Sequence, residues 1–171
     1  MRNSRGFTIL EVLVAVFLLT LGVGGALTLT NQTSAASQTA ASRLVASYLA
    51  QEGIEVARSI RDSNFLKLHQ GQGGVAWNDG LPEGVQYLNY NRETAGTPNL
   101  VVWENGSYVL YSEPNCQYYL VQCRDTVFNR QIEISYPEGG VIKIKSVVSW
   151  QERGRPHQVF TEELLYNWWQ Q

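Results

Sequence analysis

The chain has 171 residues, a formal net charge of −2 and only 16% charged residues, against about 25% in an average protein. With 44% hydrophobic residues it can build a core, which excludes a disordered acidic or basic protein, and its balanced charge makes nucleic acid an unlikely partner. Two Cys and two His are too few for a disulfide-dense miniprotein or a Cys- or His-rich metal site, so we expect neither metal nor cofactor.

The apolar residues are concentrated near the start, where residues 7–29 read FTILEVLVAVFLLTLGVGGALTL with a single charge, Glu11. As a helix this segment would be about 35 Å long, enough to cross a hydrocarbon core of about 30 Å. Arg2 and Arg5 precede it, and the next basic residue is Arg43. We therefore expect one membrane-spanning helix at residues 7–29, with the N-terminus in the cytoplasm and the rest of the chain outside.

Two ordinary readings fit the apolar segment but leave Glu11 unexplained. One is a cleaved secretory signal with small residues at Thr33–Ala36, and the other is a plain signal anchor. A carboxylate costs roughly 2.5–3.5 kcal/mol at the bilayer centre and less near an edge, where Glu11 would lie. Because a carboxylate at this position raises the free energy of membrane insertion, we expect Glu11 to have a function and a partner of opposite charge.

The residues around Glu11 give the most specific signal in the chain. Gly6-Phe7-Thr8-Ile9-Leu10-Glu11, after a short basic leader, resembles the prepilin cleavage and methylation motif of type IV pilins and type II secretion pseudopilins. The resemblance implies a leader at residues 1–6, cleavage between Gly6 and Phe7, and N-methylation of Phe7. It also implies that Glu11 serves assembly, where it can pair with the Phe7 amine of a neighbouring subunit.

The same resemblance implies a set of partners. These are a prepilin peptidase, other pilin subunits bound through the N-terminal helix, an inner-membrane assembly platform and the lipid bilayer itself. The chain departs from many members of the family at Thr28, where they carry Pro. Its local weakness is Gly22-Val23-Gly24-Gly25, so we expect any bending or melting there, and Gly22 with Ala26 permits close helix approach.

Residues 30–62 continue without Pro and become amphipathic, with an apolar stripe at Leu44, Val45, Tyr48, Leu49, Val56 and Ile60. We predict one long helix over residues 7–62, whose second half is covered by a folded head. The alternative is two helices with a break at the polar, small-residue stretch Thr30–Ser37.

Residues 63–171 have the pattern of a globular head. A Gly-rich connection follows the helix, with Trp77 and Leu81 as expected anchors. Strand patterns follow at residues 85–88, 100–103, 108–111, 127–136 and 141–150, and residues 159–166 form a last strand or a short helix. Asn105-Gly106 and the segments 137–140 and 153–156 are turn signals, so consecutive strands predict an antiparallel sheet.

The remaining chemistry-bearing residues give weaker predictions. Cys116 and Cys123 would form a disulfide outside the membrane, the alternative being two unpaired buried thiols. His69 and His157 lie in no metal-ligand spacing, and no nucleophile or phosphate-binding motif occurs, so we predict no catalytic residue. Exposed Trp side chains could stack on sugar rings or single-stranded DNA, but core packing is the favoured role.

Together these observations predict an α+β protein in which a long N-terminal helix packs on an antiparallel β-sheet head, the ladle of the pilin family. The predicted function is a structural subunit, a minor pilin or pseudopilin of a type IV pilus or type II secretion-like filament, and not an enzyme. It would be a single-pass cytoplasmic membrane protein with an extracytoplasmic head, and later part of a cell-surface or periplasmic filament. The alternative is a secreted carbohydrate- or substrate-binding β domain with an ordinary signal sequence.

Overall fold

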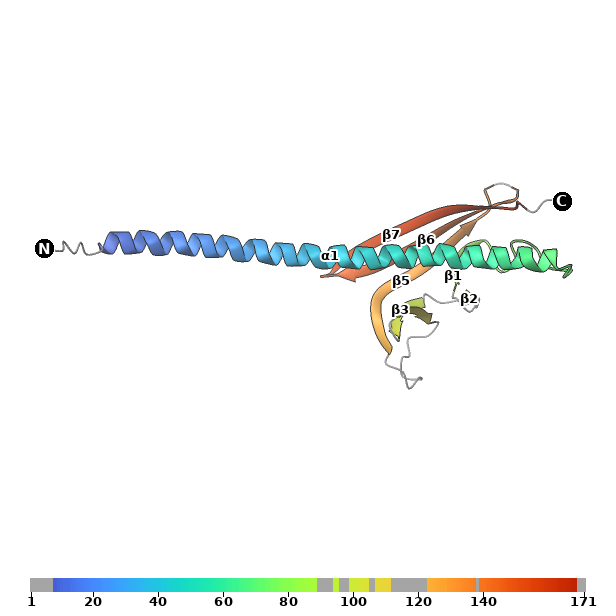
Figure 1. Cartoon of the computed structure of the whole chain (residues 1–171), viewed down its shortest axis with the longest axis horizontal. Coiled ribbons are helices and arrows are strands. Elements are labelled where there is room, and N and C mark those ends of the chain that lie inside the picture. Colours follow the sequence, from blue (N-terminus) through green and yellow to red (C-terminus); the bar gives the residue numbers. More distant parts are fainter. Residues whose placement is uncertain are drawn as a thin grey trace. The chain divides into compact units, whose positions relative to one another are not determined.

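A computed structural model describes residues 8–88, 94–95, 99–104, 107–111, 123–137 and 139–168. It contains one helix, α1 (Ile9–His69), followed by seven strands (Figure 1). The strands are β1 (Gly84–Leu88), β2 (Thr94–Ala95), β3 (Asn99–Glu104), β4 (Ser107–Tyr111), β5 (Cys123–Ser135), β6 (Val141–Glu152) and β7 (Arg155–Tyr166). The chain divides into an N-terminal unit, residues 1–42, and a second unit, residues 43–171, which holds the end of α1 and the described strands.

Helix α1 is continuous, so the predicted alternative of a break at Thr30–Ser37 is wrong. The predicted end at Asp62 is also wrong, because the helix continues to His69. Gly71 supplies the stop: it has φ +72°, its N–H donates to the Leu68 carbonyl at 3.1 Å, and the Gln72 N–H donates to the Lys67 carbonyl at 3.1 Å. This pair of bonds is a Schellman motif, whose left-handed position favours Gly.

The sheet is built around β5, with the antiparallel order β1–β5–β6–β7. Strand β3 pairs with the first half of β5, and β4 pairs with β3. Glu104 is paired with Ser107, which confirms the predicted hairpin around Asn105-Gly106 at the level of strand pairing. The predicted alternation over residues 127–136 and 141–150 is confirmed, and the last segment is a strand.

The β6–β7 turn has a defined backbone. Glu152 is paired with Arg155, and the two residues between them, Arg153 and Gly154, have φ values of +53° and +74°. Two left-handed residues in a two-residue loop are the pattern of a type I′ turn, whose twist matches that of the strands it joins. Pro156 lies at the start of β7, an edge strand among the described elements, where a missing N–H is tolerated.

The second half of α1 packs on one face of the sheet, so the predicted α+β layout is confirmed. Most buried residues of β5, β6 and β7 alternate along the strands, as the pleat requires: Phe128, Arg130, Ile132, Ile134, Ile142, Ile144, Ser146, Val148, Trp150 and Leu165. Val147, on the opposite face of β6, is also buried. The helix contributes Ala46, Leu49, Ala50, Gly53, Ile54, Val56, Ala57, Ile60, Asn64 and Phe65.

The predicted apolar stripe of α1 is partly wrong. Leu49, Val56 and Ile60 are buried, but Leu44 and Tyr48 are 57% and 64% exposed. The reason is that small residues such as Ala50 and Gly53, and not large apolar ones, line the closest approach between helix and sheet. A hydropathy pattern gives those small side chains little weight, so it misplaces the centre of the buried face.

The connection after α1 packs on the core through Trp77 and Leu81, the two residues predicted to anchor it. Leu81 is fully buried, and the Trp77 ring stacks on Phe65 with centroids 6.2 Å apart. The Asn64 side-chain amide donates to the carbonyls of Trp77, at 3.2 Å, and Asp79, at 2.7 Å. Asn64 thus satisfies two backbone groups of an irregular segment, which accounts for its burial.

Candidate functional site

The start of α1 carries a helix cap built from the motif residues. The Glu11 backbone N–H donates to Thr8 Oγ1 at 3.2 Å, and the Val12 N–H donates to the Thr8 carbonyl at 3.2 Å. Thr8 is therefore the N-cap and Glu11 the third helical residue, the positions that the T-x-x-E capping box assigns to them. An anion there is also favoured by the helix dipole. The site explains how a carboxylate is tolerated at the start of an apolar helix.

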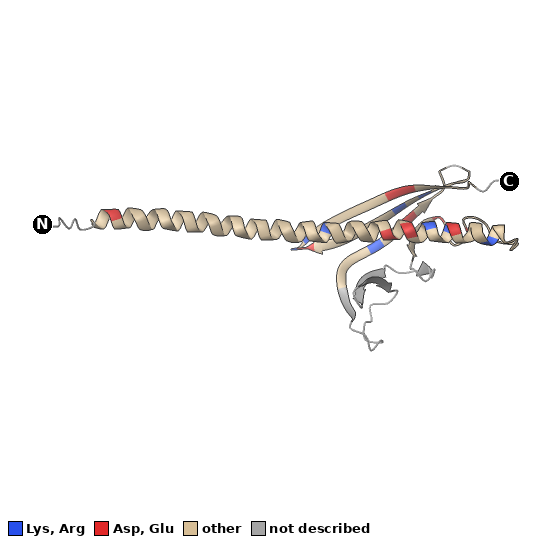
Figure 2. Cartoon of the chain, in the orientation of Figure 1, with Lys and Arg blue, Asp and Glu red and all other residues tan. Residues whose placement is uncertain are grey.

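After Glu11 the helix carries no charged side chain until the second unit begins (Figure 2), and it is predominantly apolar as far as Leu29. None of its most apolar stretch is buried, and it is long and apolar enough to cross a membrane. Ile9 and Leu10, which lie between Thr8 and Glu11, are among its most exposed side chains. An apolar helix that no part of its own unit covers needs lipid or other helices around it.

The glycines of the apolar stretch are not required by packing within the chain. A Cβ added to Gly22, Gly24 or Gly25 would have no neighbour within 4 Å. Two threonine hydroxyls bond to the helix near them, Thr28 Oγ1 to the Gly24 carbonyl at 2.9 Å and Thr30 Oγ1 to the Ala26 carbonyl at 2.9 Å. These hydroxyls are satisfied without water, which suits an apolar environment.

In the second unit, Gly53 marks the tightest approach between α1 and the sheet. A Cβ at this position would overlap Ser146 Oγ and lie 3.1 Å from Ser146 Cβ and 3.4 Å from Arg130 Cδ. No other helical residue type fits there without movement of the sheet. Gly53 therefore fixes which turn of the helix faces β5 and β6.

Beside Gly53 lies a buried arginine. The Arg130 side chain is 1% exposed, donates from Nη1 to the Leu49 carbonyl at 3.0 Å, and pairs with Glu52 Oε2 at 3.1 Å. Burial lowers the pKa of the Arg130 guanidinium below its ordinary value, an effect that the Glu52 carboxylate opposes. Arg130 Nε and Nη2 and Ser146 Oγ have no hydrogen-bond partner among the described residues. A partly satisfied ion pair of this kind specifies one arrangement rather than adding much stability.

A second ion pair joins α1 to the edge strand. Arg58 Nη2 donates to both carboxylate oxygens of Glu163, at 2.6 and 2.7 Å, and Arg58 Nη1 lies 2.6 Å from Glu55. The hydrogen bonds to Glu163 raise the pKa of Arg58 above its ordinary value. These side chains are partly exposed, so we assign the network to orientation of β7 on the helix rather than to stability.

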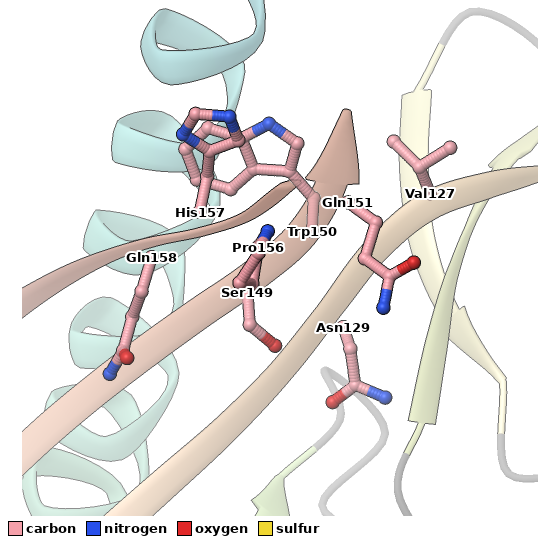
Figure 3. Close-up of a pocket in the computed structure, with 8 residues that line it drawn as sticks. All are labelled: Val127, Asn129, Ser149, Trp150, Gln151, Pro156, His157 and Gln158. Carbon is pink, nitrogen blue, oxygen red and sulfur yellow. The ribbon is translucent and has the colours of Figure 1, made fainter. Parts of the chain in front are cut away.

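A hollow of about 650 Å³ lies on β5, β6 and β7 near the β6–β7 turn (Figure 3). It is lined by Val127, Asn129, Ser149, Trp150, Gln151, Pro156, His157 and Gln158. The Trp150 indole is only 3% exposed and lies under the His157 ring, with centroids 5.3 Å apart. It therefore offers no open aromatic face on which a sugar ring could stack.

Comparison with known families matches residues 1–27 to the prokaryotic N-terminal methylation motif, which is the signature of type IV pilins and pseudopilins. The chain carries the N-terminal signature of type IV pilins and pseudopilins. No curated protein and no solved structure is significantly similar to it. The motif implies processing by a prepilin peptidase and assembly with other pilins, and together with the apolar helix it indicates a membrane-anchored protein.

Several predicted site residues lie outside the described part of the chain. These are Gly6 and Phe7, Cys116, and the side chain of Cys123, whose backbone begins β5. Within the described part, no group of three His, Cys, Asp or Glu side chains is placed to hold a metal ion. His69 lies at the end of α1 and His157 on β7.

Sequence reasoning missed three residues: Thr8, Gly53 and Arg130. The T-x-x-E spacing of Thr8 and Glu11 was a usable signal for the cap. Arg130 lies two residues from both Phe128 and Ile132 on β5, so strict alternation places all three on the same, buried face of the sheet. No pattern signalled Gly53, because its partner Ser146 is distant in sequence.

Proposed function

We propose that the chain is a structural subunit, a minor pilin or pseudopilin, of a type IV pilus or type II secretion-like filament. The observation that carries this proposal is the carboxylate of Glu11 in the first turn of an exposed apolar helix, five residues after Gly6 of the methylation motif. The family is one of structural subunits, and the cap and apolar surface supply assembly chemistry, not catalysis.

The proposed sequence of events follows from the charges. The precursor waits in the cytoplasmic membrane with residues 1–6 in the cytoplasm and the second unit outside. A prepilin peptidase removes the leader after Gly6 and methylates the amine of Phe7, which keeps its positive charge. The assembly platform then moves the subunit into a bundle of helices, where Glu11 of one subunit pairs with the Phe7 amine of another.

Pairing between subunits is favoured over pairing within one chain. The positive end of the helix dipole disfavours a cation at Phe7 and favours the anion at Glu11. A staggered neighbour can bring its amine to the carboxylate without that conflict. The pair offsets two charges in a dry bundle and fixes the stagger between subunits, as a filament requires.

The test of the proposed function is the mature N-terminus together with the location of the protein. Mass spectrometry of the native protein should find an N-methylated chain beginning at Phe7, and the sheared-filament fraction should contain that chain. A Gly6→Ala variant at matched expression is the control, because it should block cleavage and stay in the membrane. A chain beginning near Ser37 would instead support a secreted β domain with an ordinary signal and would overturn the proposal.

A further inference from the structure

The face of β5, β6 and β7 that α1 does not cover has a different chemistry at its two ends. Toward the β5–β6 turn its charged side chains pair across the strands: Lys145 lies 3.0 Å from Glu133, and Lys143 lies 3.0 Å from Glu162. Toward the β6–β7 turn lies the hollow of about 650 Å³ (Figure 3). Among the described residues that line this hollow there is no Asp, Glu, Lys or Arg. The uncharged end of the face is therefore also its concave end.

Three carboxamides and one hydroxyl line the hollow, and we refer to Asn129, Ser149, Gln151 and Gln158 as the amide cluster. Asn129 is the register partner of Ser149, and Ser149 is the register partner of Gln158, so these three form one row across β5, β6 and β7. Gln151 follows Ser149 by two residues and lies on the same face. Neighbouring strands are about 4.8 Å apart, so the row is about 10 Å long. Figure 3 shows the amide cluster on one side of the strands and the two aromatic rings on the other.

The fold makes no use of the hydrogen-bonding groups of the amide cluster. Within the part of the chain that the structure describes, none of its side chains has a hydrogen-bond partner. Gln131, the next carboxamide on the same face of β5, differs because it lies 3.5 Å from the Glu133 carboxylate. A carboxamide has an acceptor oxygen and an NH₂ group that donates, and a hydroxyl does both. The hollow therefore presents donors and acceptors side by side, all of them open to a ligand.

We propose that the hollow binds a neutral glycan, whose hydroxyl groups exchange hydrogen bonds with the amide cluster. Each sugar hydroxyl both donates and accepts, which matches the carboxamides and the hydroxyl of the lining. Val127, which is 60% exposed, and Pro156 supply apolar surface for the C–H groups of a sugar ring. An acidic sugar would find no opposite charge in the lining, so the ligand is an uncharged one. The hollow lies wholly in the second unit, and the inference goes beyond the proposed filament function.

The strands beneath the hollow hold its lining in place. Trp150 is 3% exposed and packs between two rings, with centroids 5.8 Å from Phe128 and 5.3 Å from His157. The spacing of the amide cluster is therefore fixed before a ligand arrives, which lowers the entropic cost of binding.

The lining favours a glycan over a protein partner. The centre of a protein interface is enriched in aromatic residues, Met and Arg, whereas the centre of this hollow is made of amides and a hydroxyl. Since His157 covers the Trp150 indole, hydrogen bonds and not aromatic stacking must hold the sugar. We therefore expect weak binding by a single head, which dense display of the glycan would strengthen.

The test is binding of the full-length chain to a dense array of oligosaccharides, in a detergent without a sugar headgroup. The array carries neutral cello-, malto-, manno- and chito-oligosaccharides beside acidic oligogalacturonate and heparin fragments. We expect binding to at least one neutral series that high salt does not weaken, because no ion pair is involved. Absence of binding to every neutral series would overturn the inference. Binding only to the acidic glycans, lost in high salt, would also overturn it, because recognition would then depend on charges outside the hollow.

Substitutions in the amide cluster place the binding in the hollow. Gln151→Met and Gln158→Met keep the length of the side chain and remove its hydrogen bonds. Each should weaken the affinity for the bound neutral glycan by about two- to tenfold, the size expected for one lost hydrogen bond. Gln131→Met is the matched control, because it is the same substitution on the same face outside the lining, and it should not change the affinity. Thermal unfolding checks that all three variants fold, and equal affinities in the three would overturn the inference.

The outcomes separate the inference from the proposed function. A chain that enters sheared filaments but binds no neutral glycan would overturn the glycan site and leave the filament function standing. Gln158→Met that lowers filament incorporation without changing glycan binding would assign the hollow to a contact between subunits, and would overturn the inference as well. Wild-type protein that binds a neutral glycan but is absent from sheared filaments would overturn the proposed function alone.

Discussion

At the scale of single residues, Gly53 shows how a position without a side chain can decide the packing of a helix. A glycine inside a helix costs about 1 kcal/mol relative to Ala. Here the absence of a side chain allows α1 to approach β6 until only Ser146 and the aliphatic stem of Arg130 separate the two backbones. The buried guanidinium then uses the nearby Leu49 carbonyl and the Glu52 carboxylate as its partners.

Gly53→Ala should destabilise the head by about 1–3 kcal/mol, since overpacking outweighs the gain in helix propensity. Ser146→Ala should be nearly neutral, because it removes a buried hydroxyl that has no partner among the described residues. The double variant should lose less than Gly53→Ala alone, because the overlapping Oγ is gone. Urea unfolding of the detergent-solubilised protein measures all three, and an equal loss in both backgrounds would contradict the contact.

Glu11→Ala should leave membrane insertion and leader cleavage intact, because the bond between Gly6 and Phe7 is unchanged and a costly carboxylate is removed. Incorporation into sheared filaments should fall, since an unpaired Phe7 amine in a dry bundle costs roughly 3–5 kcal/mol. Thr8→Ala is the matched control: it removes the helix cap, worth about 1 kcal/mol, and keeps the carboxylate. Equal incorporation of Glu11→Ala and wild type at matched membrane levels would show that Glu11 does not set the stagger.

At the scale of elements, the strands and their hairpins could be predicted because each depends on residues that are close together in the sequence. Alternation placed Ile132, Ile144 and Trp150 on the buried face, and that assignment is confirmed. The helix face could not be placed from hydropathy, because its contact row is made of small residues opposite Ser146 and Arg130. The predicted end of α1 at Asp62 is wrong, because the helix continues to the C-terminal cap formed by Gly71.

The β6–β7 turn gives a prediction at this scale. Gly154→Ala should destabilise the hairpin by about 1–2 kcal/mol, because a Cβ is disfavoured at φ +74°. Arg153→Asn should be neutral or stabilising, since Asn-Gly is the preferred pair in a type I′ turn. Gly139→Ala, in the β5–β6 turn, is the control, because its φ is not left-handed and a Cβ there meets nothing. Thermal unfolding followed by circular dichroism would contradict the turn assignment if Gly154→Ala and Gly139→Ala had the same midpoint.

At the scale of the whole molecule, both core clusters use residues from Val45 onward, so the second unit has its own core. The sequence predicts the end of the apolar run at Leu29, whereas the second unit begins at Arg43. The sequence could not predict which surfaces are exposed to other molecules. The exposure of Leu44 and Trp168 depends on the rotation of the helix about its axis as it packs on the sheet.

A fragment that begins at Asn31 should therefore be soluble and fold cooperatively. It lacks the exposed apolar stretch and retains every buried residue of both clusters. Circular dichroism and a cooperative thermal transition would check this expectation. Aggregation, or a broad transition without fixed tertiary signals, would show that the head depends on the N-terminal half of α1.

The disulfide prediction belongs to the same scale. Non-reducing peptide mapping of membrane-inserted protein should recover Cys116 linked to Cys123. A bridge that closes so short a loop should stabilise the head by about 2–3 kcal/mol. Its reduction should loosen the head and leave membrane insertion unchanged, since the two depend on different parts of the chain. Two alkylatable thiols in untreated protein would disprove the bridge.

The close contact at Gly53 also has a mechanical consequence. Tension applied along α1 reaches the sheet where helix and strands cannot slide past one another. A slide of one residue would bring Ile54 or Glu52 against Ser146 in place of a glycine. The helix would therefore resist axial displacement at this turn before the apolar contacts on either side began to yield. Single-molecule pulling on α1 should show the Gly53→Ala head detaching at lower force than the wild-type head.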